Sequence, residues 1–121
     1  MKLLALVPML QVDDIQSTID FYTDTLGFSC DAFEADWGWA SVQKDTISIM
    51  LALPNQHLPY HSSYMTGSLY LRTDNVDAWW QELKDKTELV YPIENFDYGM
   101  REFAIKDCNG YMLQFGQPVN D

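Results

Sequence analysis

Two histidines are the first residues whose spacing suggests chemistry. His57 and His61 are four residues apart, and on a helix this spacing would place both imidazoles on one face, as half of a zinc site. Pro59 lies between them, and the surrounding segment is rich in proline, serine and asparagine, which predicts a loop instead. We therefore interpret the segment as a surface loop or a lid over a binding site, and not as a metal site. The candidate lid residues are His57, Tyr60, His61 and Tyr64.

Cysteine usage and charge argue against several other classes of protein. Cys30 and Cys108 are far apart and show no C-x-x-C spacing, so neither a zinc knuckle nor a thioredoxin-type site is indicated. The net charge is −11, which repels phosphate backbones and anionic lipid surfaces. No run approaches the ~18 apolar residues of a membrane span. We expect a cytoplasmic protein with neither a nucleic-acid partner nor a membrane partner.

Two stretches of the chain repeat the same order of elements. Residues 13–28, "DDIQSTIDFYTDTLGF", begin with a capping aspartate, carry apolar residues at helical spacing and end at a glycine, which predicts a helix. A strand is expected before this helix, over 3–12, and three short strands after it. The order begins again at 69–86, "LYLRTDNVDAWWQELKDK", where Leu71 aligns with Leu10. The repeat predicts an α+β fold of two βαβββ modules, with module one over 1–53, a linker over 54–67 and module two over 68–121.

The chain resembles the vicinal oxygen chelate superfamily, which includes glyoxalase I, bleomycin-resistance proteins and extradiol dioxygenases. The resemblance rests on "VDDIQSTIDFYTDTLGF" in the first half and "GMREFAIKDCNGYMLQFG" in the second, and it covers nearly the whole chain. The runs "VDAWWQEL" and "REFAIKDCNG" look most like the bleomycin-resistance branch. The resemblance implies curved sheets around a cavity, a homodimer and a small-molecule ligand.

Metal-dependent members of this superfamily hold one divalent ion with four side chains, a pair from each module. The matching positions in this chain are Val7, Met50, Ser68 and Gln114. Valine offers no ligand atom, and methionine sulfur suits copper(I) better than zinc, nickel, iron or magnesium. We therefore expect no metal and no cofactor, and we interpret Gln114 as a hydrogen-bonding handle for a ligand.

Hairpin geometry predicts which side chains face the cavity in the first half. If Lys44-Asp45 is a two-residue loop, Ser48 and Met50 share a face with Trp39 because paired residues point the same way. Trp37 would join that face by the two-residue period of a strand.

In the second half the face depends on the length of the loop after Lys106. A loop of two or four residues would put Arg101 and Phe103 on the face of Gln114, whereas a loop of three would reverse it. We adopt the even loop. The predicted ligand-binding residues of both halves are Trp37, Trp39, Met50, Ser68, Tyr70, Arg72, Arg101, Phe103, Met112 and Gln114.

Binding without catalysis is the function that these features favour. The resemblance implies a metal-free protein of the bleomycin-resistance type that sequesters an aromatic or cationic small molecule. One alternative is a glyoxalase-like or dioxygenase-like metalloenzyme. A second is a dimeric interaction module whose cavity is vestigial.

Overall fold

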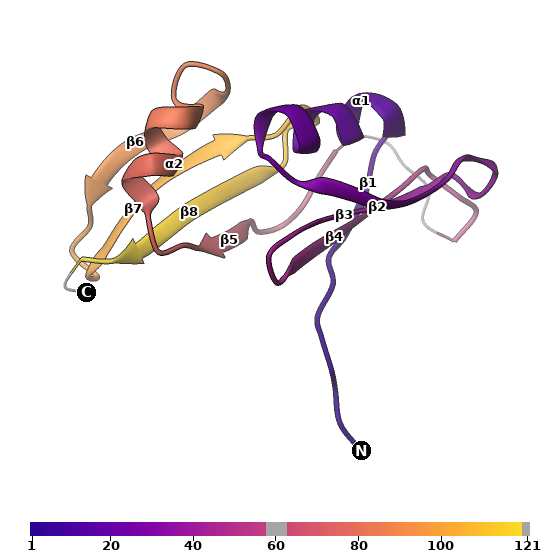
Figure 1. The fold of residues 1–121 in the computed structure, drawn as a ribbon, viewed down its shortest axis with the longest axis horizontal. Helices are drawn as coiled ribbons and strands as arrows, with labels where there is room; N and C mark the ends of the chain where they lie inside the picture. Colours follow the sequence, from indigo (N-terminus) through magenta and orange to yellow (C-terminus); the bar gives the residue numbers. More distant parts are fainter. Residues whose placement is uncertain (58–62, 120–121) are drawn as a thin grey trace. The chain divides into compact units, whose positions relative to one another are not determined.

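A computed structural model describes residues 1–57 and 63–119, and Figure 1 shows its ribbon. The chain divides into two compact units, unit one over Met1–Ser63 and unit two over Tyr64–Asp121. Tyr60 and His61, two of the candidate lid residues, lie outside the described residues. The exact module bounds expected from the sequence stay a prediction.

Unit one is a four-stranded sheet with a helix on one face. Along the chain come β1 (Met9–Gln11), α1 (Ile15–Asp20), the π-helical segment η1 (Phe21–Thr25), β2 (Ser29–Glu34), the 3-10 turn η2 (Ala35–Trp37), β3 (Trp39–Lys44) and β4 (Ile47–Ala52). The strand order is β1-β4-β3-β2, with β1 parallel to β4 and the other pairs antiparallel.

α1 and η1 together form the helical segment that the sequence indicated, from a capping aspartate to Gly27, although α1 itself ends at Asp20. The Asp14 carboxylate accepts a hydrogen bond from the backbone N–H of Ser17 at 3.0 Å and caps the helix. Ile15 and Ile19 are buried against the sheet. The chain leaves the helical segment through Gly27, whose φ of +78° lies in the left-handed region that favours glycine.

Unit two repeats this plan. Its elements are β5 (Leu69–Arg72), α2 (Val76–Leu83), β6 (Glu88–Asn95), β7 (Met100–Lys106) and β8 (Met112–Pro118). The strand order is β5-β8-β7-β6, again with one parallel pair, β5 with β8. The expected α+β fold of two βαβββ modules is confirmed. Both sheets are open, with two edge strands each, and an enclosed cavity stays a prediction.

The core of unit two lies between α2 and one face of its sheet. Trp80 packs edge-on against Phe103 at a ring separation of 5.3 Å, and Trp79 packs against Phe115 at 5.1 Å. Phe103 and Phe115 stack on each other at 5.1 Å across β7 and β8. Because α2 covers this face (Figure 1), the opposite face of the sheet is the one that a ligand could reach within unit two.

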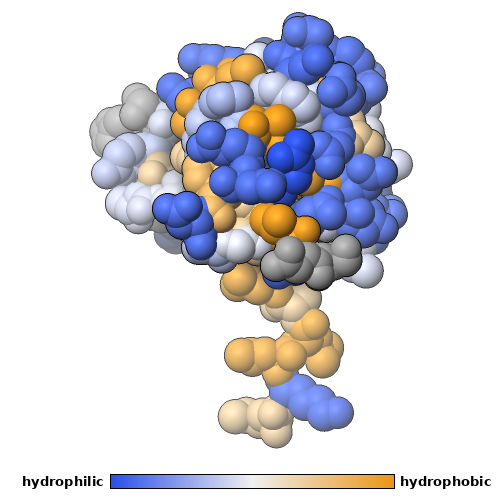
Figure 2. Space-filling model, turned by 90° about the vertical axis from the view of Figure 1, so that its left-hand side faces the viewer, coloured by the Kyte–Doolittle hydropathy of each residue, from blue (hydrophilic) through white to orange (hydrophobic). Residues whose placement is uncertain are grey.

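The predicted strand over 3–12 is wrong for most of its length. Only Met9–Gln11 pairs, because a parallel partner is present for these three residues alone. The apolar side chains of Leu3, Leu4 and Leu6 are fully exposed, and Figure 2 shows the segment as a mostly hydrophobic extension. Among the described residues, no helix is both long enough and apolar enough to cross a membrane.

Candidate functional site

The loop between β7 and β8 decides which residues share a face in unit two. Asp107 is buried, and its carboxylate accepts hydrogen bonds from the backbone N–H groups of Asn109 and Tyr111, each at 2.9 Å. These bonds widen the turn, so five residues separate Lys106 from its partner Met112. Five is an odd number, and an odd loop reverses the face that an even loop would give.

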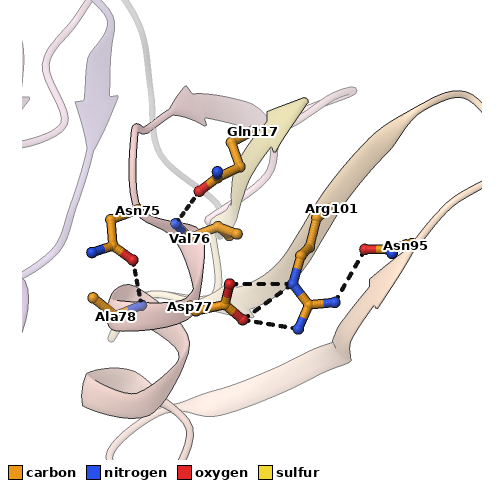
Figure 3. A network of polar contacts seen from close by, with 7 residues as sticks. All are labelled: Asn75, Val76, Asp77, Ala78, Asn95, Arg101 and Gln117. Carbon is orange, nitrogen blue, oxygen red and sulfur yellow. Dashed lines mark hydrogen bonds and ion pairs between the residues drawn. The ribbon is translucent and has the colours of Figure 1, made fainter. Parts of the chain in front are cut away.

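Two predicted binding residues are therefore on the wrong face. Phe103 pairs with Phe115 and is fully buried beneath α2, so it belongs to the core. Arg101 lies on the same side of the sheet, where its guanidinium donates to Asp77 at 2.8 Å and to Asn95 at 3.1 Å (Figure 3). The adjacent carboxylate of Asp77 raises the pKa of Arg101. The expectation that Arg101 and Phe103 line the binding face is wrong.

Glu102 takes their place on the face of Gln114. Its side chain is only 1% exposed and pairs across the strands with Gly116. One carboxylate oxygen accepts a hydrogen bond from the Tyr70 hydroxyl at 2.8 Å. The other accepts from the Tyr91 hydroxyl and, at 3.5 Å, from the Gln114 amide. Three side chains from three strands thus converge on one buried carboxylate.

A glycine lets Tyr70 reach that carboxylate. Tyr70 is on β5 and Glu102 on β7, so the tyrosine must cross β8, which lies between them. A Cβ atom at Gly116 would lie 2.0 Å from the Tyr70 hydroxyl oxygen, which is far inside van der Waals contact. The missing side chain at Gly116 is therefore what leaves room for the bond from Tyr70 to Glu102.

Gln114 connects Ser68 with this carboxylate. The Ser68 hydroxyl donates to Gln114 Oε1 at 2.5 Å, and Gln114 Nε2 donates to the Tyr91 hydroxyl at 2.9 Å. The five residues of this network, which we call the Glu102 cluster, are Ser68, Tyr70, Tyr91, Glu102 and Gln114.

The cluster keeps its tyrosines in the neutral form. Burial, and then the hydrogen bond to negatively charged Glu102, raise the pKa of Tyr70 far above the usual value. Burial also raises the pKa of Tyr91 to about 12, although its bond with Gln114 works in the other direction. Tyr98 shows the same upward shift, caused by desolvation and then by Glu102. All three rings thus lie within the electrostatic reach of one carboxylate.

Other predicted residues of unit two flank the cluster. Met112 is half-buried and shares the face of Gln114, as expected from the period of the strand. Arg72 is exposed at the end of β5, opposite Gly116. Tyr64 is exposed and lies before β5. Their roles in binding stay predictions.

Unit one has a corresponding face of different chemistry. Ser41 pairs with Met50 and Gln43 with Ser48, which is a shift of two residues from the predicted register. A shift of two preserves the face, so the shared face of Trp39, Ser48 and Met50 is confirmed. The carboxylate of Glu34, which pairs with Trp39, lies on this face but is exposed, in contrast with the buried carboxylate of Glu102 in unit two.

The placement of Trp37 in a strand is wrong. Trp37 ends the 3-10 turn Ala35–Trp37, and Gly38 then takes a left-handed φ of +65°, which breaks the two-residue period before β3 begins. The Trp37 side chain is 77% exposed. His57 is also exposed, and its backbone N–H donates to the side chain of Asn55 at 2.8 Å.

Comparison with known proteins assigns the family. The family model described as the glyoxalase/bleomycin resistance protein/dioxygenase superfamily matches residues 5–115. The chain belongs to this superfamily. A search of curated protein sequences found no match.

Several solved structures share the fold along nearly the whole chain. The bleomycin-binding protein from Streptomyces verticillus, in complex with copper(II)-bleomycin, is 25% identical, with a TM-score of 0.72 over 95% of this chain and 96% of that one. A bleomycin resistance determinant encoded on transposon Tn5 is 21% identical, with a TM-score of 0.76 over 95% and 98%. TioX from Micromonospora sp. ML1 is 17% identical, with a TM-score of 0.76 over 94% and 98%.

The donor set of this superfamily member does not fit a divalent metal ion. Val7 has no ligand atom, and Met50 offers only a thioether. In unit two, Gln114 Oε1 already accepts from Ser68, whose own hydroxyl hydrogen is used in that bond. Within residues 1–57 and 63–119, no three His, Cys, Asp or Glu side chains come together as metal ligands would.

Sequence reasoning missed Glu102 and Tyr91, although a signal was present. The alternation along 111–116 puts Tyr111, Leu113 and Phe115 on the face opposite to that of Gln114. Matching apolar with apolar residues across the hairpin would pair Phe103 with that face and leave Glu102 beside Gln114. Loop length was the weaker guide. The hydrogen bonds that the Asp107 carboxylate accepts widen the turn, and the Asn109-Gly110 pair in the sequence does not predict them.

Proposed function

We propose that this protein is a metal-independent small-molecule binding protein of the bleomycin-resistance type, which sequesters an aromatic or cationic ligand without changing it chemically. The observation that carries the proposal is the Glu102 cluster. At the position where metal-dependent relatives place a ligand, Gln114 is tied by hydrogen bonds to Ser68, Tyr91 and Glu102. In this proposal, hydrogen-bonding side chains that recognise a ligand take the place of metal ligands.

The make-up of the two sheet faces supports binding. Ligand sites combine aromatic and apolar surface with a few fixed polar groups. Unit two supplies the polar groups, and Met112 with the ring of Tyr70, which is 40% exposed, supplies apolar surface. Unit one, taken by itself, has an aromatic and thioether surface in Trp39 and Met50, and thioethers adapt readily to different shapes. Assembly as a homodimer and a cytoplasmic location belong to the same proposal.

Relatives with known ligands support the class of ligand. The Streptomyces verticillus protein is a bleomycin-binding protein, and the Tn5 protein is a bleomycin resistance determinant. The net charge of −11 favours the approach of a cationic molecule over an anionic one. A glyoxalase-like or dioxygenase-like enzyme would instead need ligand atoms that Val7 and Met50 do not provide.

Metal content tests the proposal first. The protein is dialysed against trace nickel, zinc, iron and manganese, and bound metal per chain is measured by elemental analysis. We expect less than a tenth of an equivalent, on the order of adventitious binding, because the donor set is incomplete. Tryptophan fluorescence is then recorded with aromatic and cationic compounds, and saturable quenching is expected. Stoichiometric metal would contradict the proposal and favour the metalloenzyme.

A further inference from the structure

Every hydroxyl donor of the Glu102 cluster is already used inside the cluster. The Ser68 hydroxyl donates to Gln114, and the hydroxyls of Tyr70 and Tyr91 donate to Glu102. The Gln114 amide nitrogen donates to the Tyr91 hydroxyl and, over the longer distance of 3.5 Å, to Glu102, and both acceptors lie on the same side of that nitrogen. What remains for an incoming molecule is the second N–H of Gln114 and a larger set of lone pairs, on three hydroxyl oxygens, on the carboxylate and on the amide oxygen. The cluster therefore offers a ligand mainly hydrogen-bond acceptors.

Glu102 also forms no ion pair in the described part of the chain. Both oxygens of Glu102 accept hydrogen bonds, as those of an ionised carboxylate do. In the part of the chain that the structure describes, the ion pairs are Lys86 with Glu82 and Arg101 with Asp77, and neither involves Glu102. A buried carboxylate held only by neutral donors gains strongly from an added cation, because little water screens the attraction.

Aromatic rings surround this carboxylate. Tyr91 meets Phe96 edge-on at a ring separation of 5.4 Å, and Phe96 stacks on Tyr98 at 5.4 Å. The rings of Tyr70 and Tyr98 are accessible, at 40% and 64% exposure. Their faces are suited to a cation, while the hydroxyl oxygens provide directed acceptors.

We propose that the Glu102 cluster binds an organic cation that carries N–H groups, such as a protonated amine or a guanidinium, and discriminates against a quaternary ammonium. The inference rests on the proposed function and deepens it. A quaternary ammonium has the same charge but no hydrogen to donate, so it gains only from charge and ring faces. The ligand class therefore follows from the direction of the hydrogen bonds and not from net charge alone.

Three probes with a common ring test this inference by calorimetry on the unmodified protein. Benzylamine carries charge and N–H groups, benzyltrimethylammonium carries charge alone, and benzyl alcohol is neutral. We expect benzylamine to bind about tenfold or more tightly than either of the others, the effect of one charge-assisted hydrogen bond. Equal binding of the two cations would overturn the inference, since the acidic surface would then explain both.

Matched variants test whether the affinity for benzylamine depends on the Glu102 carboxylate. Glu102→Gln keeps the shape of the side chain and removes its charge, and it should lower benzylamine affinity about tenfold or more. Glu88→Gln removes an exposed carboxylate from β6 and should leave the affinity within about twofold, because an exposed charge is screened. Equal losses in both variants would overturn the inference. Folding of each variant is checked by circular dichroism.

Removing single hydroxyls gives a test that does not depend on the stability of Glu102→Gln. Tyr70→Phe and Tyr91→Phe each remove one hydroxyl acceptor and free one lone pair of Glu102 while keeping the ring, so each should change the preference for benzylamine over benzyltrimethylammonium. An unchanged preference in both would overturn the inference. If instead a neutral aromatic compound binds best and quenches tryptophan fluorescence, the proposed function stands and this inference fails.

Discussion

The two sheets of this protein have the same plan, and their helix-free faces differ in chemistry. In unit one the face carries Met9, Met50 and Trp39, with serines between them. In unit two the equivalent strands carry Tyr70 and Gln114, which belong to a network around buried Glu102. The position of Met9 opposite Met50 corresponds to that of Tyr70 opposite Gln114.

This difference shows that a repeated fold does not repeat its chemistry. The covered faces are alike, because both helices need an apolar surface to pack on: Leu51 and Ile49 in unit one serve as Phe115 and Leu113 do in unit two. The uncovered faces pack against no described helix of their own unit, so their side chains need not be apolar. One has adaptable thioether and indole surface, and the other has fixed polar groups around a buried carboxylate.

The largest expected effect tests which face of unit two is the core. Phe103→Ala should lower the free energy of unfolding by about 3–5 kcal/mol, because the ring is buried between α2 and β8. Urea denaturation measures the change. Phe33→Ala, at an exposed position of β2, is the control and should cost less than about 1 kcal/mol. A loss of binding without a loss of stability in Phe103→Ala would restore the even-loop assignment.

A smaller effect tests whether Gly116 leaves room for the Tyr70 side chain to cross β8. Gly116→Ala should cost about 1–3 kcal/mol, because the new methyl group would meet the Tyr70 hydroxyl. In a Tyr70→Ala background the same change should cost much less, so the double-mutant cycle should show a clear coupling energy. Gly67→Ala has open space around it and should stay within about 0.5 kcal/mol. Additive costs would show that Tyr70 does not cross β8 at this point.

The tyrosines of unit two predict an alkaline loss of stability. Because the pKa values of Tyr70 and Tyr91 are raised on folding, their contribution is fully present below the unfolded value of about 10. It is lost as the pH rises through the folded values. The double variant Tyr70→Phe/Tyr91→Phe should therefore show a shallower decline in unfolding free energy above about pH 10. A decline as steep as that of the unmodified protein would contradict the account.

The smallest effect concerns the ion pair on the covered side. Asp77→Asn should lower the free energy of unfolding by about 0.2–1 kcal/mol, because the Arg101–Asp77 pair is largely exposed. It should leave benzylamine binding unchanged, since both residues lie on the helix side of the sheet (Figure 3). A changed affinity would place Arg101 back at the binding face.

The fold could be predicted from the sequence because its signals are local. Asp14 and Asn75 cap the two helices, and apolar residues recur at helical spacing in both. These local signals predict where each helix begins. The candidate site could be predicted only in part. Gln114, Ser68 and Tyr70 were found from the repeat and the resemblance. Glu102 was missed because a buried Asp107 sets the loop length, and its bonds depend on the folded turn.

The central claim is that the ligand binds at the face of Glu102, and mapping of benzylamine by two-dimensional NMR tests it most directly. Backbone amide shifts are recorded during a titration with benzylamine, with benzyltrimethylammonium as the control. The account predicts that the largest saturable changes occur around Tyr70, Glu102 and Gln114, with smaller changes for the control. Changes concentrated around Trp37 and Trp39, or spread evenly over the acidic surface, would contradict it.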